Sequence, residues 1–272
     1  MTAHMPITSA NDDDRRLQWL MEAVERNRFI PSPELAEVFV GDGDFRAIGA
    51  EFLGHLVRIG GLRPDHRVLD IGSGIGRIAA PLTQYLAPLA SYLGIDPERS
   101  GVTWCKQHIT SVYPNFQFRH IDVAHRLYNP TGLLRGETLV LPVGDNSIDF
   151  IAMISIVTHL PAAEIITYCH EIARVLAPGG TCFVTSFAVD KANANGQGRD
   201  ARCAFTPIAG GPAWSGNPTD PLAMIAYDEG WLEQRLLEAG LTSLQSHRGR
   251  WRGTEAPHFQ DIVVARKASE TK

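Results

Sequence analysis

The chain has 272 residues, of which 44% are hydrophobic and 20% charged, a composition ordinary for a soluble globular protein. Its length suits one elaborated α/β domain better than two independent domains. The 25 Lys and Arg residues are outnumbered by 30 Asp and Glu, and they form no run that would indicate general binding to nucleic acid. No apolar stretch reaches the roughly 18 to 20 residues that a membrane-spanning helix needs.

The N-terminus and the cysteines indicate a cytoplasmic protein. Residues 1–16 are polar and acidic and lack the apolar segment of a signal peptide. The four cysteines show no metal-binding spacing, and three of them fall within predicted helices or strands, where a buried free thiol is the usual state. We therefore expect a cytoplasmic location. The sequence leaves the oligomeric state open, a homodimer included.

Residues 1–63 are predicted to form a helical cap. Apolar residues recur at helical spacing after the acidic segment 12–14, which suits the N-terminus of a helix. Pro31 breaks the chain after this helix, and a second short helix is expected over 34–40. A third helix is predicted over 44–59.

Residues 64–272 form the second predicted unit, in which strand-like and helix-like segments alternate. The predicted strands are 66–71, 91–95, 116–121, 147–155 and 181–188, and the predicted helices between them are 75–86, 98–111 and 161–176. Such alternation produces parallel strands with crossover helices on both faces, which is a doubly wound α/β sheet.

The C-terminal part departs from this alternation. After a helix predicted over 228–239, the strand-like runs 241–247 and 259–265 follow each other without a helix, which predicts an antiparallel hairpin at the sheet edge. Residues 190–226 are rich in Gly, Pro, Asn and Ala and show no periodicity. A loop of this length inside a compact domain is usually functional or mobile, so we expect an insertion that acts as a lid.

The strongest motif is VLDIGSGIG at residues 68–76. A strand, a glycine-rich turn and a helix follow one another in the order that places a nucleotide ligand at the carboxyl edge of a parallel sheet. Glycines let the backbone approach the ligand and are expected to expose amide N–H groups to it. A dinucleotide site needs the spacing G-x-G-x-x-G, but Arg77 occupies the place of the third glycine. The motif therefore disfavours a nicotinamide-dependent oxidoreductase.

Three acidic residues follow or end the first three strands. Asp70 precedes the glycines and could attract the α-ammonium group of S-adenosylmethionine, whereas it would repel a pyrophosphate. Asp96 could accept hydrogen bonds from both ribose hydroxyls. Asp122 could accept from the adenine amino group, with Ile121 and Val123 beside the ring. The residues alone leave other interpretations open: a plain tight turn for the glycines, a helix cap for Asp96 and a structural role for Asp122.

Five segments carry a resemblance to a known family: VLDIGSGIG, YLGIDPE, FRHIDV, LPVGDNSIDFIAMISIVTHL and EIARVLAPGG. By these segments, which cover roughly residues 65–190, the chain resembles the class I S-adenosylmethionine-dependent methyltransferases, of the bacterial small-molecule type. The resemblance implies a Rossmann-like sheet of seven mostly parallel strands with an antiparallel last strand, and a methyltransferase domain over 64–272. The expected cofactor-binding residues are Asp70, Gly72, Ser73, Gly74, Gly76, Asp96, Pro97, Asp122, Val123 and Ser155.

Methyl transfer from a sulfonium requires the protein to align the acceptor, exclude water and, for a hydroxyl acceptor, remove a proton. His159 follows the fourth strand at the same sheet edge and is the candidate catalytic base, because an imidazole titrates in the useful range. It could instead pack over the cofactor or position the substrate. Members of the family that use a metal place an acid where Ser155 stands, so we expect metal-independent transfer and no metal ligands.

The methyl acceptor is expected to be a small molecule. The chain lacks the motifs typical of DNA amino-methylating enzymes and of arginine methyltransferases, which leaves a hydroxyl or amine of a sugar, lipid head group or natural product. Glu164 and Glu171 are expected on a solvated helix face. The alternative function is a non-catalytic S-adenosylmethionine-binding regulator that lacks an acceptor pocket. The candidate acceptor-binding residues are Phe29, Phe39, Phe45, Arg202, Phe205, Trp214, Trp251 and His258.

Overall fold

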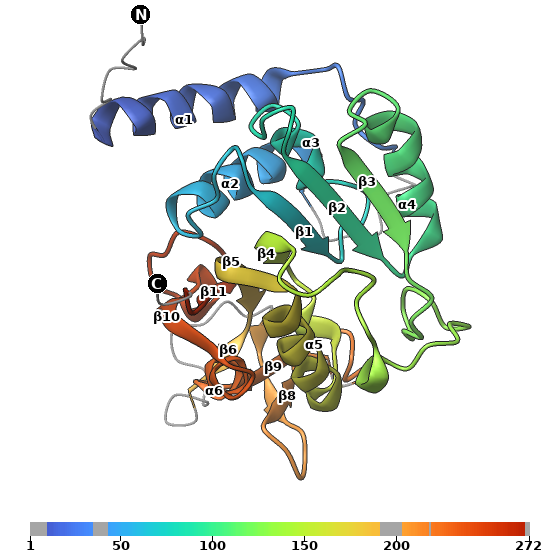
Figure 1. Cartoon of the computed structure of the whole chain (residues 1–272). Coiled ribbons are helices and arrows are strands. Elements are labelled where there is room, and N and C mark those ends of the chain that lie inside the picture. Colours follow the sequence, from blue (N-terminus) through green and yellow to red (C-terminus); the bar gives the residue numbers. More distant parts are fainter. Residues whose placement is uncertain (1–9, 35–42, 191–202, 218, 270–272) are drawn as a thin grey trace, which may run out of the picture.

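The computed structural model describes residues 10–34, 43–190, 203–217 and 219–269. Its centre is a seven-stranded sheet in the order β10-β11-β5-β4-β1-β2-β3 (Figure 1). β1 lies parallel between β2 and β4, whereas β11 runs antiparallel to both of its neighbours. The strands are β1 Arg67–Ile71, β2 Ser91–Asp96, β3 Phe116–His120, β4 Ile148–Met153, β5 Leu176–Ser186, β10 Leu241–His247 and β11 Asp261–Lys267. The predicted doubly wound sheet with an antiparallel last strand is confirmed, and the C-terminal hairpin forms one edge.

Helices cover both faces of this sheet (Figure 1). Alternate residues of a strand point to opposite faces, so Val68 of β1 packs in one buried cluster with Leu53 of α2, and Leu69 packs in the other with Ile165 of α5. The helices are α1 Ala10–Arg26, α2 Phe45–Arg58, α3 Ala79–Leu82, α4 Arg99–Cys105, α5 Ala162–Val175 and α6 Trp231–Glu238. Burial of both faces explains why the central strands read as continuous apolar runs.

The N-terminal helix α1 packs on α2, and α2 packs on the sheet. Asp44 caps α2, because its carboxylate accepts hydrogen bonds from the N–H groups of Arg46 (2.9 Å) and Ala47 (2.8 Å). Gly54 permits the close approach of α1, since a Cβ at this position would lie 2.7 Å from the Cε of Met21. The short helix predicted over 34–40 lies, from residue 35 on, outside the described residues.

The helix predicted over 75–86 is wrong in extent. Only α3, Ala79–Leu82, is regular, and the chain before it follows a buried loop in which Gly72, Gly74 and Gly76 all have positive φ. The apolar residues at helical spacing reflect burial of this loop rather than a long helix. Positive φ at three positions interrupts the right-handed helical path.

A second, four-stranded sheet is built from the segment 190–226 that the sequence predicted as a loop and from the residues that flank it. Its order is β6-β9-β8-β7, and the strands are β6 Ala188–Val189, β7 Thr206–Pro207, β8 Ala213–Ser215 and β9 Ile225–Asp228. Strands of two to four residues are too short to show a period in the sequence. Residues 203–217 and 219–226 therefore contain regular short strands, and the lid function of 190–226 stays a prediction.

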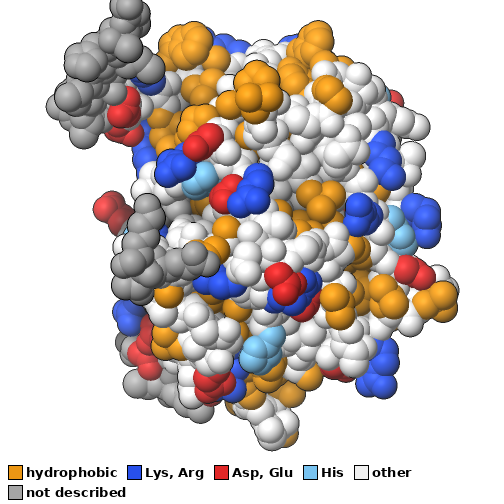
Figure 2. Space-filling view, viewed as in Figure 1, with side chains coloured by type: hydrophobic (Ala, Val, Ile, Leu, Met, Phe, Trp, Pro, Cys, Tyr) orange, Lys and Arg blue, Asp and Glu red, His pale blue; other side chains and the backbone are white. Residues whose placement is uncertain are grey.

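Charged and apolar side chains are interspersed on the face drawn in Figure 2, and among the residues coloured there neither charge gathers into a continuous patch. Within the described part of the chain, no helix is both long and apolar enough to cross a membrane. All four cysteines are buried and free, as expected for the three that lie in predicted helices or strands.

Candidate cofactor and active site

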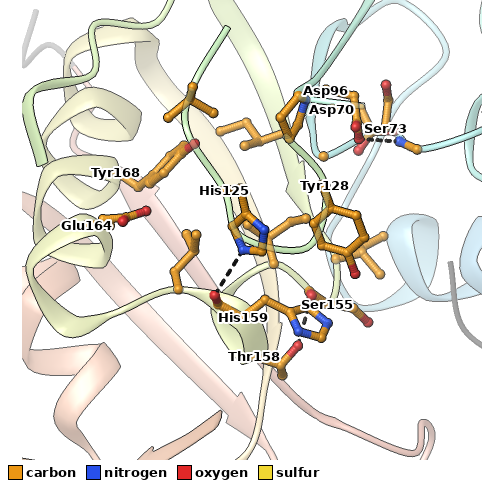
Figure 3. A pocket seen from close by; sticks show the side chains of 18 of the residues that line it. Asp70, Ser73, Asp96, His125, Tyr128, Ser155, Thr158, His159, Glu164 and Tyr168 are labelled. Atoms are coloured by element: carbon orange, nitrogen blue, oxygen red, sulfur yellow. Dashed lines mark hydrogen bonds between the residues drawn. The ribbon is translucent and has the colours of Figure 1, made fainter. Parts of the chain in front are cut away.

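A cavity of about 340 Å³ lies at the carboxyl ends of β1, β2 and β4, where the strand order reverses between β1 and β4 (Figure 3). Open α/β sheets bind their ligands at such a reversal point. Of the predicted site residues, nine line this cavity and two, Gly76 and Asp122, do not. The nine are Asp70, Gly72, Ser73, Gly74, Asp96, Pro97, Val123, Ser155 and His159.

The carboxylate of Asp70 is buried against a neutral partner. Its side chain is 1% exposed and accepts a hydrogen bond from the hydroxyl of Tyr92, which lies on the neighbouring strand β2. Burial raises the pKa of Asp70 to about 7; the Tyr92 hydrogen bond opposes this rise and the negative charge of Asp96 adds to it. Its negative charge is thus costly in the protein without a ligand.

Asp96 is held by backbone N–H groups. One carboxylate oxygen accepts from the N–H of Gly74 and the other from the N–H of Glu98, both at 2.7 Å. Burial nevertheless raises the pKa of Asp96 to about 6. Among the described residues, no Lys or Arg forms an ion pair with Asp70 or Asp96. Each carboxylate oxygen can accept two hydrogen bonds, so Asp96 retains capacity for a ligand hydroxyl.

The first three N–H groups of the glycine loop are used within the protein and not presented to the cavity, which corrects the expectation from its composition. The N–H groups of Gly72 and Ser73 donate to the carbonyl of Ile95 at 2.8 and 3.1 Å, and that of Gly74 donates to Asp96. A pyrophosphate would need these donors. Their internal use is a second argument against a dinucleotide site.

Gly72 and Ser73 shape the loop for a ligand. Gly72 has φ +78°, and a Cβ at this position would collide with the side chain of Ile156, so both backbone conformation and space require glycine. The Oγ of Ser73 is buried and has no hydrogen-bond partner among the described residues. A buried hydroxyl without a partner on a cavity wall indicates a site for a polar ligand atom.

Gly76 and Asp122 lie outside the cavity lining and make packing contacts, and their part in cofactor binding stays a prediction. A Cβ at Gly76 would lie 2.7 Å from the Cδ1 of Ile109 and 2.9 Å from the Sγ of Cys105, so this glycine brings the loop against the end of α4 and the π-helical segment Lys106–Thr110 that continues it. The carboxylate of Asp122 accepts from the side-chain amide of Asn129 at 3.1 Å. This contact shapes the loop after β3, whose neighbouring residue Val123 lines the cavity.

Ser155 has a strained backbone at the end of β4. Its φ is +59°, a conformation uncommon for serine, and its N–H donates to the Oγ1 of Thr185 at 2.8 Å. Its Oγ donates to the Oε1 of Gln260 at 3.0 Å. Gln260 also lines the cavity. The sequence alone does not reveal Gln260 as a site residue, because its tail segment meets the end of β4 only in the folded chain.

His159 ends the short 3-10 turn Val157–His159 after β4, and its half-buried ring lines the cavity. Its Nδ1 is buried and has no hydrogen-bond partner among the described residues. Burial, followed by the charge of His125, lowers the pKa of His159, and contacts with the backbone of Leu222 and Ala223 oppose the shift. The imidazole is therefore neutral near pH 7 and able to accept a proton.

His125 and Tyr128 form a wall of the cavity that no sequence motif predicts. The Nδ1 of His125 accepts from the N–H of Leu127 and its Nε2 lies 3.2 Å from the carbonyl of His159, which assigns the proton to Nε2. The ring of Tyr128 stacks on His125 with centroids 4.9 Å apart, and meets His159 edge-on at 5.9 Å. The neutral imidazole of His125 therefore orients Tyr128 and His159 rather than accepting a proton from a substrate.

The expected solvated position of Glu164 and Glu171 is wrong. Glu164 lines the cavity on the side opposite Asp70 in Figure 3, and burial raises its pKa. Glu171 accepts from the N–H of Leu141 at 2.6 Å and pairs with Arg174 at the same distance. The segment before β4 covers this face of α5, which helical periodicity could not reveal.

Most of the aromatic residues expected around the acceptor pack elsewhere. Phe205, Trp214 and Trp251 form the core of the second sheet, Phe45 belongs to the main core, and Phe29 is exposed. Phe39 and Arg202 lie outside the described residues, and His258 lies against Glu51 rather than on the cavity wall. The apolar walls of the cavity come from Phe52, Ile78, Ile156, Leu160, Phe187 and Met224.

Residues 69–184 match the family of methyltransferase domains. The sterol 24-C-methyltransferase erg6 of Schizosaccharomyces pombe is 28% identical over 120 residues, which are 44% of this chain and 27% of that protein. A methyltransferase of Mesorhizobium loti shares the fold at a TM-score of 0.53 and 13% identity, over 83% of this chain and 99% of that one. The [4+2]-cyclase SpnF also shares the fold, at a TM-score of 0.55 and 16% sequence identity, over 98% of this chain and 100% of that one.

Proposed function

The protein carries a methyltransferase domain of the class I, S-adenosylmethionine-dependent family, and on this premise we propose that it transfers a methyl group to a hydroxyl or amine of a small molecule. The observation that carries the proposal is the pair of buried carboxylates, Asp70 and Asp96, that open on one cavity without a cationic partner in the described chain. Buried charges are normally paired, so the site is complementary to a cationic ligand.

The cavity residues fit the parts of this cofactor. When bound, S-adenosylmethionine supplies an activated methyl group on a positively charged sulfur. Asp70 is placed to attract an α-ammonium group, and Asp96 to accept hydrogen bonds from ribose hydroxyls. Ser73 offers a hydroxyl that lacks a partner in the described chain, and Ile121 and Val123 offer an apolar wall for a ring.

His159 is the proposed proton acceptor for a hydroxyl substrate. Its neutral imidazole lines the same cavity, and its buried Nδ1 has no partner among the described residues. The apolar lining, which includes Phe52, Phe187 and Met224, is suited to keep water away from the reacting groups. The end of β4 carries Ser155 and no acid, so we propose that proton transfer and alignment operate without a metal.

The acceptor is proposed to have an apolar skeleton with one or two polar groups. Phe52, Phe187 and Met224 line the cavity, and Glu164, Tyr168 and His159 are among its polar side chains on the wall away from Asp70. This balance favours a natural product or lipid over a free sugar.

Calorimetry with S-adenosylhomocysteine and with NADH tests cofactor choice, and turnover of S-adenosylmethionine with a panel of hydroxylated apolar acceptors tests catalysis. We expect binding of the first ligand, no binding of NADH, and turnover with at least one acceptor. NADH binding would overturn the proposal. Tight S-adenosylhomocysteine binding with no turnover across the panel would support the non-catalytic alternative, which the open cavity disfavours.

A further inference from the structure

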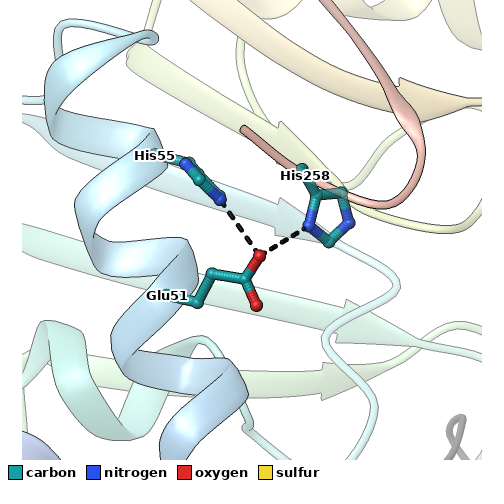
Figure 4. A group of neighbouring side chains, drawn as sticks. All are labelled: Glu51, His55 and His258. Carbon is teal, nitrogen blue, oxygen red and sulfur yellow. Dashed lines mark hydrogen bonds and ion pairs between the residues drawn. The ribbon is translucent and has the colours of Figure 1, made fainter. Parts of the chain in front are cut away.

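Two histidines and a glutamate from distant parts of the chain meet outside the cofactor site (Figure 4). Glu51 and His55 lie one helical turn apart on α2, and His258 comes from the tail, 207 residues after Glu51. The Oε1 of Glu51 lies 3.2 Å from the Nε2 of His55 and 3.1 Å from the Nδ1 of His258. All three candidate ligand atoms lie within 4.8 Å of one another.

We propose that Glu51, His55 and His258 bind a divalent metal ion of the zinc type. Two imidazole nitrogens and one carboxylate oxygen are a recognised zinc ligand set, with the fourth position left for water. Zinc–ligand bonds of about 2.0 to 2.2 Å in a tetrahedron place ligand atoms about 3.3 Å apart. The two observed separations from Glu51 already have this length, so binding requires loss of the shared protons and only small side-chain movements.

The surroundings shelter this cluster without closing it. The side chains of His55 and His258 are 14% and 11% exposed, and Glu51 is 34% exposed, so an ion can enter from solvent. The ring of Phe52 packs 4.7 Å from the His258 ring and limits its orientation. The guanidinium of Arg250 lies 3.7 Å from the same Glu51 oxygen, but its side chain is 52% exposed and can turn away when a cation binds.

The ion would join α2 to the C-terminal tail beside the acceptor cavity. Phe52 follows Glu51 directly, Gln260 comes two residues after His258, and both line the cavity. The cluster itself does not line the cavity, so the ion supports its wall and takes no part in methyl transfer. This inference stands independently of the proposed function.

Titration of the untagged, chelator-treated full chain with zinc chloride in a calorimeter tests the site. We expect one equivalent to bind, with at least a tenfold loss of affinity in His258→Ala and in Glu51→Gln, since the latter keeps the shape and weakens the ligand. His170→Ala removes an exposed histidine of α5 and serves as the matched control with unchanged affinity. Binding should weaken as pH falls, because zinc ligands must be deprotonated.

X-ray absorption of the zinc-loaded protein should show two histidine nitrogens and oxygen ligands at about 2.0 to 2.2 Å. Zinc should also raise the melting temperature of the wild type and not that of His258→Ala. Absence of stoichiometric binding, or equal affinity in His258→Ala and His170→Ala, would overturn the proposal. Calorimetry with S-adenosylhomocysteine on the same variants confirms that they are folded and separates this result from the cofactor site.

Discussion

Asp70 and Asp96 are neighbouring buried carboxylates with different hydrogen-bond donors, and this difference predicts that their substitution affects ligand binding differently. Asp70 has one neutral hydroxyl partner, whereas Asp96 has two backbone N–H donors and remains able to accept from a ligand. We therefore propose that Asp70 contacts the α-ammonium group of the ligand and that Asp96 contacts the ribose hydroxyls. Adenosine shares the ribose of the cofactor but lacks its amino-acid part, so it distinguishes the two roles.

Asp96→Ala should weaken binding of both S-adenosylhomocysteine and adenosine by about 1 to 3 kcal/mol, the size of hydrogen bonds to a charged group. Asp70→Asn should weaken only S-adenosylhomocysteine. Calorimetry at pH 8 measures both, and Asp65→Asn, a change in an exposed surface pair, is the control. Unchanged affinity in Asp96→Ala would remove this residue from the ribose site.

His159→Ala should lower turnover about 10²- to 10⁴-fold, the usual contribution of a general base, with little change in the affinity for S-adenosylhomocysteine. His170→Ala, an exposed histidine on α5, should turn over like the wild type. Steady-state kinetics with a hydroxyl acceptor and calorimetry separate the two effects. If His159→Ala retains full turnover, His159 is not the base. If the variant only raises the KM for the acceptor, His159 has a positioning role.

The glycine loop after β1 is defined by close contact rather than by exposed amides. Gly72→Ala places a Cβ against Ile156 at a positive φ, so it should destabilise the protein by about 1 to 3 kcal/mol and weaken cofactor binding. Gly72→Ala with Ile156→Ala should recover part of the loss in urea denaturation. Gly211→Ala, where an added Cβ meets nothing within 4 Å, is the matched control. Additive effects of Gly72→Ala and Ile156→Ala would contradict the contact.

Asp261, the first residue of β11, connects the two sheets. Its buried carboxylate accepts from the N–H of Ala188 and of Gly249, from the indole N–H of Trp251 and from the guanidinium of Arg252, each at 2.8 Å. Ala188 begins β6, so these bonds hold the small sheet against the end of the large one.

Asp261→Ala should lower the free energy of unfolding by about 3 to 5 kcal/mol, because it leaves the N–H donors of Ala188, Gly249 and Trp251 without their acceptor and removes one of the two carboxylates that pair with Arg252. Urea denaturation followed by circular dichroism measures the loss, and Asp145→Ala, an exposed partner of Arg174, should cost under 1 kcal/mol. Equal stability of the two variants would show that the sheets are held together by apolar contacts alone.

The two raised carboxylate pKa values make stability and binding depend on pH in opposite directions. A folded pKa of about 7 for Asp70 and about 6 for Asp96, against ordinary values near 4, means that the folded chain binds more protons between these limits. Their contribution to the stability of the ligand-free protein is present below about pH 4 and is lost as pH rises to about 7.

The melting temperature of the ligand-free protein should therefore contain a contribution that falls between pH 5 and 7.5. In Asp70→Asn this dependence on pH should be weaker. Affinity for S-adenosylhomocysteine should rise over the same interval, since its α-ammonium group is attracted by an ionised carboxylate and not by a protonated one. Calorimetry at several pH values measures the second effect. A constant affinity from pH 5.5 to 8 would mean that neither carboxylate contacts the charged group.

The sequence by itself determined the doubly wound sheet, the C-terminal hairpin and the glycine loop, because these depend on periodicity and spacing over short segments. Nine of the predicted site residues line the cavity for the same reason: strand ends of a parallel sheet meet at one edge.

The tertiary structure alone decided which segments meet. It set Tyr92 under Asp70, turned Asp122 toward Asn129, and brought Gln260 to Ser155 and His258 to Glu51. Contacts between residues far apart in the chain depend on how helices and strands pack, and no local pattern encodes them. Burial, which sets the pKa values of the site, is likewise a property of the folded chain only.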